Sequence, residues 1–111
     1  MARAEELEDR RRSARVRSLR LVTLEPIGTG SGEAPIEVGR TLDVSEAGAR
    51  VEIVRELPPG QELELQIAVG DRLIQARGRV VHTERAGSLV VTGIAWVEVA
   101  PADLGLLIGK S

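Results

Sequence analysis

The stretch QELELQIAVGDRLIQARGRVVHT, residues 61–83, carries the clearest strand pattern in the sequence. Its first part alternates strictly between apolar and mostly polar residues, and the apolar positions are Leu63, Leu65, Ile67 and Val69. A period of two is the pattern of a β-strand with one buried face. Gly70 and Asp71 then provide a two-residue turn of the kind that joins antiparallel strands. The stretch therefore predicts a β-hairpin.

On either side of this hairpin, the same pattern predicts further strands over residues 16–24, 36–44, 49–54 and 89–99. In the second of these, the face expected to point inward carries Ile36, Val38, Leu42 and Val44, and Arg40 interrupts it. Residues 25–35 form a Gly-rich loop, and residues 101–110 a helix with Pro101 in its first turn. About six short strands followed by a helix predict an all-β protein, a small antiparallel barrel.

The composition limits the class of protein. With 111 residues the chain is long enough for one domain, and Trp96 is its single aromatic residue. The core must therefore be built from aliphatic side chains. There is no cysteine, no secretory signal and no apolar run of the roughly 20 residues that a membrane span needs. We expect a cytoplasmic protein without membrane insertion.

The charges are unevenly distributed. Half of the arginines lie in the first twenty residues, namely Arg3, Arg10, Arg11, Arg12, Arg15, Arg17 and Arg20, against four acidic residues there. Residues 1–15 are too short and polar for a stable isolated helix, so we expect a flexible basic arm. A basic arm on an acidic body indicates an anionic partner. Arginine, rather than lysine, favours planar or stacking recognition.

Catalytic groups are scarce. His82 is the only histidine, so a multi-histidine metal site and a histidine-activated nucleophile both lack parts. The segment GTGSG, residues 28–32, lacks the Lys-Ser/Thr pair of a phosphate-binding loop and leads into a predicted strand. We therefore expect neither an enzyme, nor a bound metal, nor a cofactor.

Two short motifs remain. In RRRSAR, residues 10–15, Arg11 and Arg15 form an R-x-x-x-R pair, which can grip a ligand or can be part of a solvated charge run. In DVSEAG, residues 43–48, Asp43, Ser45 and Gly48 fit a hairpin turn that caps its own backbone, and equally a loop that grips a polar ligand. Alternation places Asp43 opposite Leu42 and Val44, on the outside of the barrel.

Together, in this order, the two motifs resemble those of the PilZ domain family, bacterial receptors for cyclic di-GMP. The family's hallmarks are R-x-x-x-R in an N-terminal arm and [D/N]-x-S-x-x-G after one or two strands, and no hallmark position is substituted here. The resemblance covers roughly residues 10–108. It implies a six-stranded antiparallel β-barrel (16–111) with a C-terminal helix, preceded by a flexible arm (1–15).

The resemblance also implies a ligand. Cyclic di-GMP carries two phosphodiesters and two guanines, and arginine can chelate phosphate or guanine and stack on the purine. The residues expected to bind it, as one molecule or a stacked pair, are Arg10, Arg11, Arg12, Arg15, Asp43, Ser45 and Gly48. The arm would close over the ligand and change the surface seen by a downstream protein.

Two alternative functions stay open at this point. One is a PilZ-like interaction module that binds protein and no nucleotide. The other is a nucleic-acid-binding barrel. A body that is acidic and nearly free of aromatic residues argues against DNA or RNA as a partner.

Overall fold

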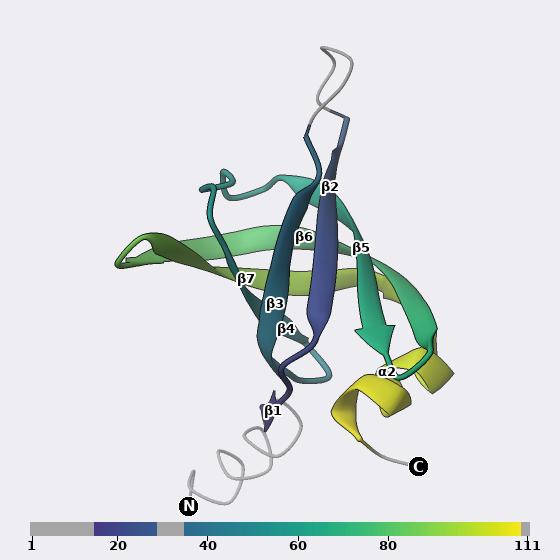
Figure 1. The fold of residues 1–111 in the computed structure, drawn as a ribbon. Coiled ribbons are helices and arrows are strands. Elements are labelled where there is room, and N and C mark those ends of the chain that lie inside the picture. The colour runs from purple at the N-terminus through teal and green to yellow at the C-terminus, as the bar shows by residue number, and fades with distance from the viewer. Residues whose placement is uncertain (1–14, 29–34, 110–111) are drawn as a thin grey trace, which may run out of the picture.

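The computed structural model describes residues 15–28 and 35–109, and this part of the chain forms seven strands and one helix (Figure 1). In chain order the elements are β1 (Val16–Arg17), β2 (Leu21–Ile27), β3 (Glu37–Val44), β4 (Gly48–Ile53), β5 (Glu62–Val69), β6 (Arg72–Ala86), β7 (Leu89–Val99) and α2 (Pro101–Ile108). The predicted hairpin of residues 61–83 is confirmed, because β5 and β6 pair in antiparallel register around Gly70 and Asp71.

Six of the strands close into a barrel. The sheet order is β1-β3-β2-β5-β6-β7-β4, and a further pairing between β3 and β4 completes the ring. Every pairing is antiparallel, so the predicted six-stranded antiparallel barrel is confirmed. The extra strand, β1, pairs with β3 through Val16 opposite Val44 and Arg17 opposite Asp43.

The core is aliphatic, as the composition requires. Leu63, Leu65 and Ile67 of β5 are at most 1% exposed, and the inward residues of β4 are buried with them. Trp96 is only partly buried and packs against the edge of this cluster. Burial of branched and unbranched aliphatic side chains along alternating positions is what holds the strands in this register.

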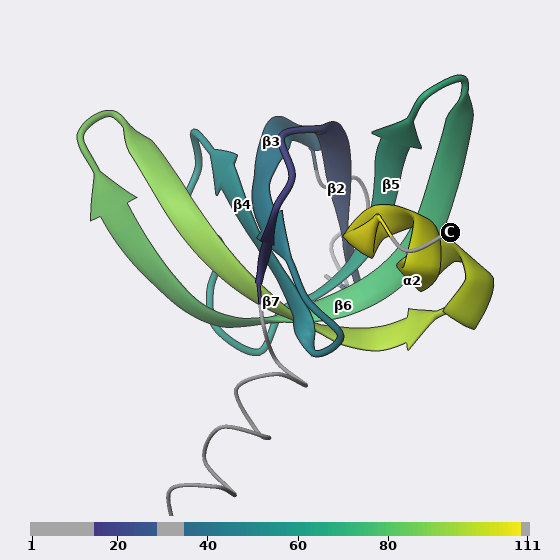
Figure 2. The same cartoon turned by 90° about the horizontal axis from the view of Figure 1, so that it is seen from below.

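The helix α2 lies across one end of the barrel, beside β5 and β6 (Figure 2). It begins at Pro101, and Leu107 is 1% exposed while Leu104 and Ile108 pack against the core more loosely. The apolar face of the helix therefore packs against the core at this end of the barrel. No helix within residues 15–28 and 35–109 is long and apolar enough to cross a membrane.

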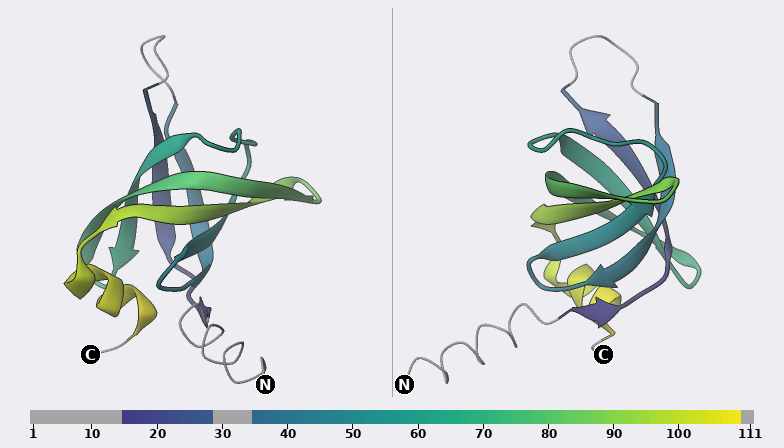
Figure 3. Two further views of the ribbon diagram at one scale, coloured as in Figure 1. Left: turned by 180° about the vertical axis from the view of Figure 1, so that it is seen from behind. Right: turned by 90° about the vertical axis from the view of Figure 1, so that its left-hand side faces the viewer.

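The hairpin of β6 and β7 extends beyond the barrel wall (Figure 3). The strand β5 pairs with β6 only as far as Arg79, yet β6 and β7 stay paired to Ala86 and Leu89. The turn between these two strands is short, since β6 ends at Ala86 and β7 begins at Leu89.

The strand predicted over residues 16–24 is wrong as a single strand, because it is divided at Ser18–Arg20. Ser18 donates its backbone N–H to Leu42, and Thr41 donates its own to Arg20. The Thr41 hydroxyl donates to the Ser18 carbonyl and accepts from the Arg20 N–H. These bonds hold β1 and β2 along the same edge of β3 while Leu19 is pushed outward to 52% exposure.

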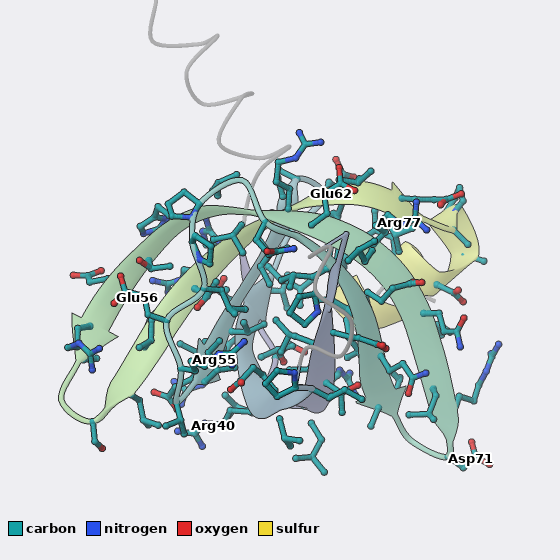
Figure 4. The ribbon with its side chains drawn as sticks, turned by 90° about the horizontal axis from the view of Figure 1, so that it is seen from above. Arg40, Arg55, Glu56, Glu62, Asp71 and Arg77 are labelled. Atoms are coloured by element: carbon teal, nitrogen blue, oxygen red, sulfur yellow. The ribbon has the colours of Figure 1, made fainter. Side chains whose placement is uncertain are left out.

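The predicted inward face of β3 is also wrong. Ile36 and Val38 are 56% and 63% exposed, and Val44 alone of the four residues is buried. A register shift between Thr41 and Asp43 marks a β-bulge with Leu42 as the extra residue, and Thr41 points into the core. Arg40, which interrupts the predicted face, pairs with Glu52 on the outer surface (Figure 4).

Candidate ligand-binding site

The DVSEAG segment forms the turn between β3 and β4. Ser45 donates its backbone N–H to the Gly48 carbonyl at 2.8 Å. The Ser45 hydroxyl oxygen accepts the backbone N–H groups of Ala47 at 3.2 Å and Gly48 at 3.3 Å. Ser45 is only 3% exposed, so its side chain shapes the turn. The capping role that the sequence allowed for this serine is present.

Trp96 of β7 supports the turn from the neighbouring strand. Its indole N–H donates to the Ser45 carbonyl at 3.0 Å, and its backbone N–H donates to the Ala47 carbonyl at 3.0 Å. Backbone carbonyls in a turn need partners of this kind when water is kept away from them. The only aromatic residue of the chain therefore fixes the position of the motif.

Gly48 lies unusually close to β7. A Cβ atom at this position would be 1.9 Å from the Ile94 carbonyl oxygen and 2.9 Å from its carbon. Ordinary van der Waals contact begins near 3.4 Å, so no other residue fits without moving a strand. The close neighbour of Gly48 is thus the backbone of β7.

Asp43 lies on the outer face of the barrel, as predicted, but it is covered. It stands opposite Arg50 across the β3–β4 pair, and the next residue, Val44, points into the core. Its carboxylate receives Arg15 Nη1 at 2.8 Å and Arg50 Nη2 at 2.6 Å. With these two arginines against it, Asp43 is only 6% exposed.

The electrostatics of Asp43 follow from this enclosure. Burial alone would raise the pKa of the Asp43 carboxyl, but hydrogen bonds and charge from Arg50, and then from Arg15, outweigh burial and hold that pKa below its ordinary value. The same contact raises the pKa of Arg50. The site therefore holds an ionised carboxylate between two positively charged guanidinium groups.

Two hollows flank Arg15. The first, of about 440 Å³, is lined by Arg15, Arg17, Leu19, Leu42, Asp43 and Arg50. The second, of about 130 Å³, lies toward Gly48, His82 and Gly93. The first is within the size range of small-molecule sites, and its lining combines three guanidinium groups with two leucines. Such a lining suits an anionic ligand that also has flat apolar faces.

The structure thus brings four of the predicted site residues together: Arg15, Asp43, Ser45 and Gly48. Arg10, Arg11 and Arg12 lie outside the described residues. The two motifs did not point to Arg17 or Arg50. The signal for Arg50 was present, because residues 43 and 50 are equidistant from the centre of the turn and so face each other across a hairpin.

Comparison with known proteins defines the class. The family model of the PilZ domain matches residues 9–109, and the chain belongs to this family. The fold and the turn described above are consistent with that membership.

Three solved structures share the fold. The PilZ domain of YcgR from Escherichia coli, determined with c-di-GMP, has a TM-score of 0.70 at 15% identity, covering 90% of this chain and 89% of that one. The Bacillus subtilis inhibitor of motility (MotI/DgrA) has a TM-score of 0.71 at 18% identity over 90% of this chain. The PilZ domain of CeSA from a cellulose-synthesizing bacterium has a TM-score of 0.61 at 15% identity, covering 86% of this chain and 92% of that one.

The present chain corresponds to 48% of the length of the motility inhibitor. No curated protein sequence gives a significant match.

Proposed function

We propose that this chain is a non-catalytic cytoplasmic receptor for cyclic di-GMP. The observation that carries the proposal is the cluster of Arg15, Asp43 and Arg50 at the rim of the 440 Å³ hollow. Guanidinium groups suit the ligand's phosphodiesters and the O6 and N7 atoms of guanine. The ionised Asp43 suits guanine's N1–H and exocyclic amine, which are both donors.

Different arginines contact different parts of the ligand. Arg11 and Arg15 act as the clamp, and Arg10 and Arg12 extend it, so that the arm can hold one ligand or a stacked pair. Closing the arm over the barrel changes the surface that a downstream protein meets. Ser45 and Gly48 keep the turn in the shape that presents Asp43.

Family membership supports this proposal, and so does the YcgR domain determined with c-di-GMP, whose fold this chain shares. At such low identity the likeness concerns the fold, so the assignment of the ligand rests on the side chains of this chain.

Calorimetric titration with cyclic di-GMP tests the proposal. We expect saturable binding by the wild type and loss of that binding in Arg15→Ala. Arg79→Ala is the matched control, because Arg79 also makes a 2.8 Å ion pair from the barrel surface, with Glu62, away from the hollow. Equal affinity of Arg15→Ala and Arg79→Ala would remove Arg15 from the site.

A second candidate is a module that binds a protein and no nucleotide. Its supporting observation is the exposure of apolar residues on β2 and β3 and just before each of them: Leu21 and Val38, with Leu19 and Ile36. Exposed apolar surface, where it is contiguous, is typical of protein interfaces. Two results together would favour this candidate: the wild type does not bind cyclic di-GMP, and Leu21→Ser weakens its binding to a protein partner.

A further inference from the structure

The two oxygens of Asp43 are held by different arginines. Oδ1 accepts one N–H, from Arg15 Nη1 at 2.8 Å. Oδ2 accepts the Nε–H of Arg50 at 2.8 Å and also lies 2.6 Å from Arg50 Nη2 in an ion pair. Two guanidinium nitrogens of Arg50 therefore lie against Oδ2, whereas a single nitrogen of Arg15 lies against Oδ1. A carboxylate oxygen has two lone pairs, so Oδ1 retains one free position.

The backbones that carry the two arginines also differ. Arg50 lies within β4, opposite Asp43 in β3 on one side and opposite Gly93 in β7 on the other. Arg15 precedes β1, a strand of two residues that pairs only with β3. The guanidinium of Arg50 is thus fixed by the barrel, whereas that of Arg15 depends on a short edge pairing.

We propose that Arg50 is a positioning residue: it stays on Oδ2 and holds the Asp43 carboxylate oriented, while Arg15 leaves Oδ1 for the ligand's phosphate when the ligand binds. This proposal rests on the function proposed above. Departure of Arg15 frees both lone pairs of Oδ1 for the two donors on the Watson–Crick edge of guanine. Neither hallmark motif contains Arg50.

The charges around the hollow agree with such an exchange. Arg15 and Arg17 on the β1 side and Arg50 on β4 surround Asp43, which leaves two positive charges in excess for the two phosphodiesters. Glu84 of β6 also acts on Arg50 and raises its pKa further. Once Arg15 has moved to a phosphate, Arg50 is the counter-ion in direct contact with Asp43.

Removal of Arg50 should therefore change the protonation of Asp43 in the complex. A buried carboxyl without its counter-ion, beside an anionic ligand, has a raised pKa. In the wild-type complex Arg50 keeps its contact and lowers the pKa of Asp43, so we expect acidification within the neutral to mildly acidic range to leave it ionised. Affinity should then depend on pH in an Arg50 variant and be independent of pH in the wild type over this range.

The test is the affinity for cyclic di-GMP at about pH 7 and about pH 5, for wild type, Arg50→Gln, Arg15→Gln and Arg40→Gln. Arg40 is the matched control, since it makes a 2.9 Å cross-strand ion pair with Glu52 between the same two strands and does not line the hollow. We expect Arg50→Gln to bind about tenfold more weakly near neutral pH and weaker still in acid.

Arg15→Gln should lose affinity by the same factor at both pH values, because it loses a phosphate contact, and Arg40→Gln should stay within about twofold of wild type. A pH-dependent loss in Arg15→Gln, with none in Arg50→Gln, would assign the positioning role to Arg15 and overturn the proposal. Absence of binding by the wild type would instead refute the proposed function itself.

Arg50→Lys serves as the second variant, with thermal unfolding as the check on folding. It keeps the charge and loses the planar guanidinium, which places two nitrogens against Oδ2, so we expect affinity below wild type with the pH independence of the wild type. Affinity equal to wild type in Arg50→Lys would show that the guanidinium contact on Oδ2 has no role in positioning.

Discussion

Replacement of Gly48 by alanine tests whether the motif glycine is needed for packing inside the protein. The new Cβ would lie 1.9 Å from the Ile94 carbonyl oxygen and 3.1 Å from the Ala95 Cα atom. Both neighbours are backbone atoms and cannot turn away. To reach ordinary contact, β4 and β7 must separate locally by about 1.5 Å.

That separation sets the expected magnitude. Overpacking of this kind costs about 1–3 kcal/mol. A shift of this size also breaks a hydrogen bond between the strands or within the turn, which adds about 0.5–1.5 kcal/mol. We therefore expect Gly48→Ala to lower the free energy of unfolding by about 2–4 kcal/mol, which corresponds to a loss of about 9–17 °C in Tm for a domain of this size.

Urea denaturation of Gly48→Ala and Gly87→Ala measures this directly. Gly87 has φ +66°, and a Cβ atom added there would have nothing within 4 Å, so its replacement carries only the left-handed backbone penalty, about 1–2 kcal/mol. If Gly48→Ala destabilises no more than Gly87→Ala does, the close approach to β7 is not the reason for glycine at this position.

Three further predictions concern the core, the pH response and the stoichiometry. Thr92→Val should raise stability by about 1 kcal/mol and Thr41→Val should lower it by about 1–3 kcal/mol, because both side chains are 0% exposed but only the Thr92 hydroxyl lacks a partner among the described residues. Urea denaturation that shows Thr92→Val to be less stable than wild type, or Thr41→Val to be more stable, would refute this. The pKa of Asp43 is lowered in the folded state, so the stability that its charge contributes is present above the ordinary Asp pKa near 4 and is lost as pH falls through the lower folded value. Wild type should accordingly be more stable than Asp43→Asn near neutral pH, and the two should converge in strong acid. A difference that does not change with pH would contradict the lowered pKa of Asp43. If the arm holds a stacked pair of ligands, calorimetry should give two per chain for wild type and one for Arg10→Leu; a wild-type value of one would exclude the pair.

The sequence predicts most of the barrel because its strands are encoded locally. The alternation of Leu63, Leu65 and Ile67 and the turn at Gly70 determine a hairpin without reference to distant residues. The closing strand 89–99 matches β7 residue for residue. Its apolar residues on both faces predict a central strand, and β7 indeed lies between β6 and β4.

Long-range bonds account for the errors in β1–β3. The hydroxyl of Thr41 bonds across to Ser18 and Arg20, which divides one predicted strand and creates a bulge at Leu42. Neither event leaves a local trace, because threonine has a high β propensity and Leu42 fits an alternating pattern. The exposed apolar residues of β3 continue that pattern on the outer face, where alternation alone cannot tell inside from outside.

Local motifs and long-range contacts also explain why only part of the candidate site could be predicted. Asp43, Ser45 and Gly48 are close in sequence, and their motif is visible as a string. The burial of Asp43 depends on Arg50 across the β3–β4 pair and on Arg15, 28 residues away in the chain. Arg50 can be recognised as the partner of Asp43 only when the residues at the centre of the turn, and with them the pairing of β3 and β4, are known.

The most direct test of the proposed function is the discrimination of cyclic di-GMP from cyclic di-AMP by the wild-type protein, measured by calorimetry under one set of conditions. An ionised Asp43 accepts the N1–H and amine of guanine, whereas adenine presents an acceptor at N1, and an unpaired buried polar group costs about 1–3 kcal/mol. We predict saturable binding of cyclic di-GMP with an affinity at least about tenfold above that for cyclic di-AMP. Equal affinities, or no binding of cyclic di-GMP, would contradict the role proposed for Asp43 and its arginines.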